Sequence, residues 1–122
     1  AALAALTGDA STITRMAEEF KARRDLLVEA LRTVPGVACV PPQGAFYAFC
    51  DVSAWVGRRT RDGRVLRDDQ AIAAWLLEAA HVAVVPGSAF LAPGHLRLSY
   101  AVALDRIEEA LRRIATAAAT LA

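Results

Sequence analysis

Residues 82–100, with the sequence VAVVPGSAFLAPGHLRLSY, contain the pattern that decides the fold. The stretch begins with four apolar residues, 82–85, which predict a buried strand. Pro86-Gly87 ends this strand, because proline has no N–H to donate to a strand ladder. A loop rich in proline and glycine follows. Residues 96–100 then alternate apolar and polar side chains, and this alternation predicts a second strand.

A long amphipathic helix comes earlier in the chain. Gly8 ends a short initial helix, and Asp9, Ser11 and Thr12 supply oxygens that can cap the next one. Apolar residues then recur on one helical face until Pro35-Gly36 ends the helix. This face consists of Ile13, Met16, Phe20, Leu27, Leu31 and Val34.

Two more strands are predicted after this helix. Residues 37–40 are short and apolar, and residues 41–44 form a turn because they contain two prolines and a glycine. Residues 45–50 include three aromatic side chains and predict the next strand. Residues 51–55 are expected to form a turn or a single helical coil, which Asp51 caps.

The charged segment 58–67 contains an Asp62-Gly63 turn signal and is expected to be an exposed loop. Asp68 and Asp69 then start a helix, because carboxylates are favourable at its positive N-terminal end. The apolar face of that helix consists of Ile72, Trp75, Leu76 and Ala79. A terminal helix is marked by Leu104, Ile107, Leu111 and Ile114, with arginines on its outer side.

The predicted order is helix, strand, strand, helix, strand, strand, helix. Helices and strands that intermix in this way predict an α/β or α+β two-layer sandwich. The 122 residues fit a single domain, 1–122. A chain of this length can bury roughly two-thirds of its unfolded surface, which is enough for a hydrophobic core.

Composition excludes several classes of function. Hydrophobic residues make up 56% of the chain, which argues against disorder. The net charge is +1, from 14 basic and 13 acidic residues, so no general attraction to nucleic acid or to an anionic membrane is expected. No apolar run reaches the roughly 20 residues that a membrane span needs. Residues 1–6 have no basic leader, and residues 1–8 are expected to be the end of a helix that begins upstream.

Cysteines and histidines give no metal site. Cys39 and Cys50 lack ligand spacing and fall in apolar, strand-like segments, where small buried thiols are common. A disulfide between them stays open as an alternative, and a reducing cytoplasm is the expected compartment. His81 and His95 are isolated histidines, expected at a helix-to-strand junction and in the loop before Arg97. An ordinary loop role is favoured for His95, with an approach to the cleft as the alternative.

Arg97 is the most informative single residue. Composition alone favours an exposed arginine on an edge strand, because arginine is mostly exposed in proteins. The context favours a different role, since Arg97 stands between Leu96 and Leu98 after a loop rich in proline and glycine. A guanidinium that projects from a strand into a cleft offers a rigid fork of donors to a carboxylate.

Four segments resemble class I aminotransferases of the aspartate aminotransferase branch, in the order and spacing of the C-terminal small domain. Three of them are Pro42-Gln-Gly-Ala-Phe-Tyr47, Val82-Ala-Val-Val-Pro-Gly-Ser-Ala-Phe90 and Leu96-Arg-Leu-Ser-Tyr-Ala101. The fourth is Phe20-Lys-Ala-Arg-Arg-Asp25 followed by Pro35-Gly36, which is similar to the helix and turn that open that domain. The resemblance covers essentially the whole chain.

The resemblance implies the small domain of a fold-type I enzyme that depends on pyridoxal 5'-phosphate (PLP). It implies a homodimer, a large domain upstream, and amino acid and 2-oxo acid substrates. Arg97 matches the arginine that binds the substrate α-carboxylate. Phe90 matches a loop position near the active site, either as a substrate contact or as a structural residue. Ser88 lies in the same loop and is given no role.

The resemblance also has gaps. Leu91 stands where the family often has glycine, which could change the loop backbone or narrow the entrance to the site. Cys50 stands where proline is frequent. Lys21 is the single lysine and is expected on a solvated helix face. The cofactor lysine and the other PLP-binding residues are therefore expected upstream, in the absent large domain. The chain alone is predicted to be inactive, with no catalytic, cofactor-binding or metal-binding residue of its own.

Three functions remain in consideration. The first is an aminotransferase in which this domain supplies the carboxylate-binding arginine, with aspartate as the first substrate to test. The second is an aminotransferase-like sensory domain of a transcription regulator, which would have a DNA-binding motif upstream. The third is a free-standing amino-acid-binding module.

Overall fold

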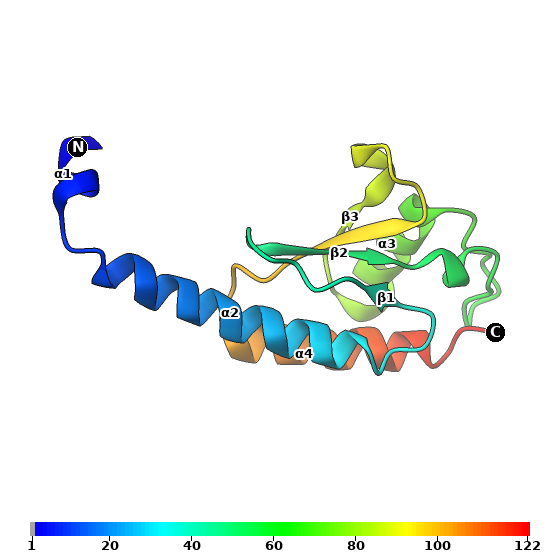
Figure 1. The fold of residues 1–122 in the computed structure, drawn as a ribbon. Coiled ribbons are helices and arrows are strands. Elements are labelled where there is room, and N and C mark those ends of the chain that lie inside the picture. The colour runs from blue at the N-terminus through cyan, green and yellow to red at the C-terminus, as the bar shows by residue number, and fades with distance from the viewer. Residues whose placement is uncertain (1) are drawn as a thin grey trace.

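The computed structural model describes residues 2–122 as one antiparallel sheet covered by helices (Figure 1). The elements follow the predicted order. They are α1 Ala2–Thr7, α2 Ser11–Leu31, β1 Ala38–Cys39, β2 Tyr47–Asp51, the 3-10 turn η1 Ser53–Trp55, α3 Asp69–Ala80, β3 Val85–Pro86, the 3-10 turn η2 Gly87–Phe90, β4 His95–Ser99 and α4 Leu104–Ala118. The predicted α/β two-layer arrangement is therefore confirmed.

The sheet has the strand order β1-β2-β4-β3, and every neighbouring pair is antiparallel. β4 is therefore an internal strand rather than an edge. Its central residue, Arg97, lies opposite Phe49 of β2 and opposite Val85 of β3. Cys39 of β1 lies opposite Cys50 of β2.

The two faces of the sheet differ because side chains alternate along each strand. Ala48, Cys50, Leu96 and Leu98 are buried on one face. The helices cover this face, where α2 packs on α4 and α4 packs on α3 (Figure 1). The alternate residues Tyr47, Phe49, His95 and Arg97 belong to the opposite face, which we call the open face.

The hydrophobic core lies between the sheet and the helices. Its members come from α2, α3 and α4, from the two central strands and from the segments that connect them. The most completely buried large side chains include Leu31, Leu66, Ile72, Leu76, Leu96 and Tyr100. None of the helices within residues 2–122 combines the length and the apolar composition needed to span a bilayer.

The long helix differs from its prediction at both ends. α2 begins at Ser11 after Ala10, which makes no side-chain cap, although Asp9 Oδ1 accepts a hydrogen bond from the Ser11 N–H at 2.9 Å. Ile13 and Met16 are 66% and 52% exposed, because this end of α2 extends beyond the sheet (Figure 1). At the other end, Val34 is buried but lies three residues beyond the helix.

Residues 82–85 do not form the predicted buried strand. Regular pairing is limited to Val85 and Pro86, and both are only partly buried. β3 is an edge strand, and proline is tolerated there because its missing N–H can face away from the neighbouring strand. His81 ends α3 in the left-handed conformation, with φ of 54°.

The prediction for α3 is confirmed at its start. The Asp68 side chain caps the helix by accepting a hydrogen bond from the Ala71 N–H at 2.7 Å. On its apolar face, Ala80 is buried in place of the predicted Ala79, which is exposed. The preceding charged loop is also less exposed than predicted, since Thr60 and Leu66 are 5% and 0% exposed.

The turn after α2 is fixed by a tryptophan. Gly36 has φ of +82°, a conformation that favours glycine. The indole Nε1–H of Trp55 donates a hydrogen bond to the Pro35 carbonyl at 2.9 Å. A Cβ added to Gly36 would lie 2.6 Å from Trp55 Nε1, so this contact requires glycine.

Candidate functional site

Arg97 stands at the centre of β4 on the open face of the sheet, as the strand prediction required. Its guanidinium carbon lies 4.7 Å from the centre of the Phe90 ring and 5.4 Å from the centre of the Tyr47 ring. Both rings attract the cation and limit where the side chain can go. Within residues 2–122, no carboxylate forms an ion pair with Arg97.

A second group of aromatic contacts supports the first. The Phe49 ring meets the Phe90 ring edge-on at a centroid distance of 6.2 Å and stacks on the His95 ring at 5.1 Å. The His95 Nδ1 lies 3.1 Å from the Pro93 carbonyl, to which it can donate a hydrogen bond. His95 was predicted to be a loop residue, but it is the first residue of β4 and lies on the open face.

The η2 turn holds Phe90 near Arg97. Gly87 is buried at the start of this turn, and a Cβ there would lie 2.3 Å from the Ala92 carbonyl oxygen. Leu91, which follows Phe90, has φ of 60° and is 95% exposed. Leu91 therefore takes the left-handed conformation that glycine favours and directs its side chain into solvent, so the departure from the family pattern does not fill the loop.

Asp69 anchors the same turn from α3. Its side chain is 2% exposed, and Oδ2 accepts a hydrogen bond from the Ser88 N–H at 2.7 Å. Burial is the largest single influence and would raise the pKa of Asp69, but the hydrogen bonds from Ser88, from Gly94 and from its own backbone N–H together lower it. Asp69 therefore stays ionised at neutral pH and ties η2 to the first turn of α3.

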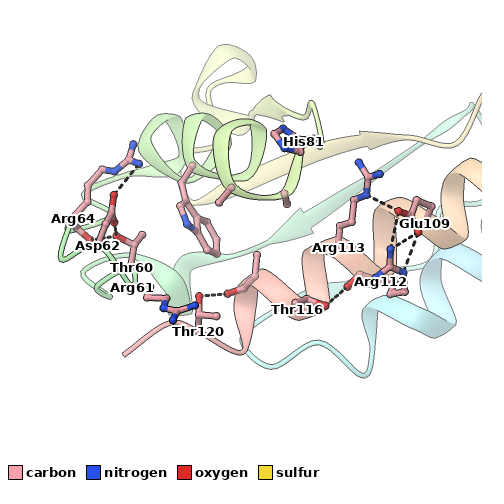
Figure 2. A pocket seen from close by; sticks show the side chains of 14 residues that line it. Thr60, Arg61, Asp62, Arg64, His81, Glu109, Arg112, Arg113, Thr116 and Thr120 are labelled. Carbon is pink, nitrogen blue, oxygen red and sulfur yellow. Dashed lines mark hydrogen bonds and ion pairs between the residues drawn. The ribbon is translucent and has the colours of Figure 1, made fainter.

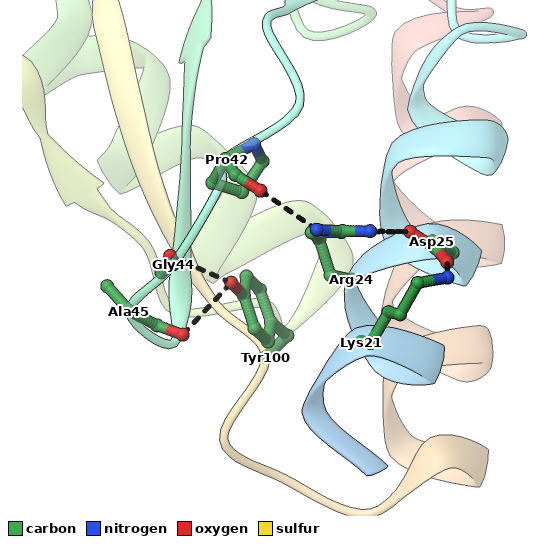
Figure 3. Close-up of polar contacts among 7 residues, drawn as sticks. All are labelled: Lys21, Arg24, Asp25, Pro42, Gly44, Ala45 and Tyr100. Atoms are coloured by element: carbon green, nitrogen blue, oxygen red, sulfur yellow. Dashed lines mark hydrogen bonds and ion pairs between the residues drawn. The ribbon is translucent and has the colours of Figure 1, made fainter. Parts of the chain in front are cut away.

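Residues 42–45, which lead into Tyr47, are held in place by Tyr100 and by Arg24 of α2 (Figure 3). The Tyr100 hydroxyl lies 3.1 Å from the Ala45 carbonyl and 3.3 Å from the Gly44 carbonyl, to which it can donate. Arg24 of α2 donates to the Pro42 carbonyl at 3.3 Å. Burial raises the pKa of Tyr100, so the hydroxyl keeps its proton at neutral pH. These contacts fix the start of β2 and with it the Tyr47 ring.

The residues of this chain do not fit a Schiff-base site for PLP. Such a site needs a lysine amine beside the cofactor. The single lysine, Lys21, is 67% exposed on α2, and its Nζ lies 2.8 Å from Asp25 Oδ2 (Figure 3). Residues 2–122 also contain no group of three or more side chains that could hold a metal ion.

A separate cavity lies away from the open face. It has a volume of about 730 Å³ and is bounded by residues 60–64, the end of α3 and α4 (Figure 2). Two of its arginines are neutralised within the cavity, since Arg112 and Arg113 both pair with Glu109, at 2.6 and 2.7 Å. None of its lining residues belongs to the open face. We place the candidate site at Arg97, because there a cation without a carboxylate partner among the described residues lies against two aromatic rings.

Two residues of this site were missed by sequence reasoning. Tyr47 was predicted to lie in a strand without a role, and Asp69 was predicted only to start a helix. The strand alternation could have revealed Tyr47, because in the antiparallel register Phe49 faces Arg97 and Tyr47 lies two residues away on the same face. No local signal links Asp69 to Ser88, which is 19 residues away.

Comparison with known proteins identifies the family. Residues 1–114 match the family described as aminotransferase class I and II. The chain belongs to this family. It is 46% identical over 113 residues to an aspartate aminotransferase of Streptomyces avermitilis, and it is 43% identical over 118 residues to an aspartate/prephenate aminotransferase of Nitrosomonas europaea. These matches cover 93% and 95% of this chain.

Solved aminotransferases share its fold. The crystal structure of the aspartate aminotransferase from Rhizobium meliloti matches 99% of this chain with a TM-score of 0.96 and 41% identity. An alanine aminotransferase from Pyrococcus furiosus matches 94% with a TM-score of 0.82 and 30% identity. The chain covers only 28% and 30% of the length of these two curated relatives, and 30% and 28% of these two structures. The resemblance to the small domain of a fold-type I enzyme is therefore confirmed.

Proposed function

We propose that residues 1–122 are the small domain of a longer PLP-dependent aminotransferase and that Arg97 binds the substrate α-carboxylate. The observation that carries this proposal is the guanidinium of Arg97, which lies against two rings on the open face with no ion-pair partner among residues 2–122.

The geometry suits a carboxylate for two reasons. A guanidinium presents N–H donors in a planar fork that matches the two oxygens of a carboxylate. The rings of Tyr47 and Phe90 leave few directions for the side chain, so less conformational freedom is lost when an anion binds. Phe90 thereby acts as a positioning residue and lies close enough to the cation to border the bound substrate.

The rest of the polypeptide supplies the chemistry in this proposal. PLP acts as the electron sink for transfer of an amino group, and a lysine outside this chain holds it. The side chains of residues 1–122 bind and orient the substrate, and the chain alone is inactive. We further propose that the intact protein is a cytoplasmic homodimer that exchanges amino groups between an amino acid and a 2-oxo acid.

Aspartate is the first substrate to test. Several relatives are named aspartate or aspartate/prephenate aminotransferases, and a solved aspartate aminotransferase from Thermus thermophilus, 40% identical, carries maleate, a dicarboxylate. None of the relatives reported above is named as a transcription regulator, so nothing favours the sensory-domain alternative or the free-standing module.

Steady-state kinetics of the full-length enzyme test this proposal. Arg97→Ala should reduce kcat/KM for aspartate about 10- to 100-fold, because a charge-assisted hydrogen bond is worth about 1.5–3 kcal/mol. An amine donor that lacks the α-carboxylate should be used equally by both enzymes. An unchanged kcat/KM for every carboxylate donor would refute the assignment.

A further inference from the structure

Two thiols face each other across the first two strands. Cys39 of β1 and Cys50 of β2 are directly opposed partners in an antiparallel ladder. Opposed residues point to the same side of a sheet, and Cys50 is fully buried on the helix-covered face. Cys39 is only partly buried, because β1 forms the edge of the sheet. A reagent from solvent can therefore reach Cys39 before it reaches Cys50.

The ladder brings these two residues within the range of a disulfide. Opposed residues in antiparallel strands have Cα atoms about 4.5–5.5 Å apart, whereas disulfides form at about 4.4–6.8 Å. Opposed Cβ atoms in antiparallel ladders lie about 4.5–5.5 Å apart, compared with about 3.5–4.5 Å in a disulfide. Closure of a pair with typical ladder spacing therefore needs an approach of about 1 Å, and strain of this kind makes a disulfide easier to reduce.

Access from solvent assigns a role to each sulfur. Cys39 lies on the edge strand and is only partly buried, whereas Cys50 is fully buried. The pKa of Cys50 is raised by its pairing with Cys39 and by burial, so this thiol keeps its proton at neutral pH. The accessible Cys39 is therefore the nucleophile and the buried Cys50 the resolving thiol.

We propose that Cys39 and Cys50 form a reversible dithiol–disulfide site that is oxidised by a small-molecule disulfide. The Cys39 thiolate attacks one sulfur of the oxidant, whose S–S bond breaks and releases one thiolate. Cys50 then loses its proton, attacks the Cys39 sulfur of the mixed disulfide, and displaces the second small thiol. One oxidant disulfide is reduced to two thiols, and the two cysteines lose two electrons and two protons.

Mass spectrometry of the full-length protein tests this inference. The reduced protein is treated with oxidised glutathione, unfolded in an alkylating reagent and digested with trypsin. Both cysteines fall in the single tryptic peptide 33–58, because Arg32 and Arg58 are its flanking cleavage sites. The expected peptide is lighter by two hydrogen atoms and carries no alkyl group, and reduction by dithiothreitol restores both alkylation sites.

Two variants separate the steps. Cys50→Ser should trap glutathione on Cys39, because the resolving thiol is missing. Cys39→Ser should leave Cys50 unmodified in the folded protein, because Cys50 is buried. In the wild type, alkylation of both cysteines after oxidation, or a glutathione adduct that persists on Cys39, would overturn the proposal. This readout needs no enzymatic activity, so it does not depend on the proposed function.

Discussion

Removal of the Asp69 carboxylate should release the turn that holds Phe90. In Asp69→Ala, the Ser88 N–H loses the partner that now lies 2.7 Å away. A hydrogen bond to a charged group contributes about 1.5–3 kcal/mol, and each 1.4 kcal/mol is a factor of ten in an equilibrium. The opening equilibrium of η2 should therefore rise about 10- to 100-fold.

Hydrogen exchange of the Ser88 amide in the full-length protein measures this opening. Asp69→Asn is the matched control, because its carbonyl oxygen can still accept the bond but without charge, so its exchange should lie between those of the wild type and Asp69→Ala. Ser88 exchange within twofold of the wild type in Asp69→Ala would refute the role given to this carboxylate.

The pH dependence of the same amide gives a second readout. The pKa of Asp69 is lowered in the folded protein, so its contribution to stability is present above the unfolded pKa of about 3.9 and is lost as pH falls through the folded value. After correction for intrinsic exchange, protection of Ser88 should persist through about pH 4 and decline below it. Asp69→Asn should show no such decline.

Two further substitutions probe the fold and the site. Gly36→Ala should lower the thermal unfolding temperature more than Gly57→Ala does. Both glycines have positive φ, but only a Cβ on Gly36 would meet Trp55. Equal shifts in the unfolding temperature would contradict the close contact between Gly36 and Trp55. Phe90→Ala should raise KM for aspartate several-fold with a smaller effect on kcat, because a cation–π contact contributes about 0.5–2 kcal/mol. Tyr47→Phe is the control: it keeps the aromatic ring beside Arg97 and should leave KM nearly unchanged. An unchanged KM in Phe90→Ala would remove Phe90 from the site.

The sequence predicted the fold wherever a periodic pattern coincided with burial. The alternation in residues 96–100 placed Arg97 on a strand, and the Asp68 cap marked the start of α3. The same reasoning failed for residues 82–85, because an apolar run does not reveal whether a strand is internal or lies at an edge. It also misplaced Ile13 and Met16, whose helical spacing was right but whose end of α2 extends past the sheet.

The site could be predicted only in part for a related reason. Arg97 and Phe90 lie in one stretch of sequence that resembles the family, so this stretch was enough to propose them as candidates. Tyr47 reaches Arg97 through the pairing of β2 with β4, and Asp69 reaches Ser88 through the packing of α3 on η2. Such long-range contacts depend on register and tertiary packing, which a single sequence does not record.

The central claim is that Arg97 binds a substrate carboxylate, and the affinity of the full-length enzyme for maleate tests it most directly. Calorimetry should give a Kd about 10- to 100-fold higher for Arg97→Ala than for the wild type. Arg97→Lys should fall between them, because it keeps the charge and loses the planar fork. A Kd for Arg97→Ala within twofold of the wild-type value, in a protein whose circular dichroism is unchanged, would contradict the claim.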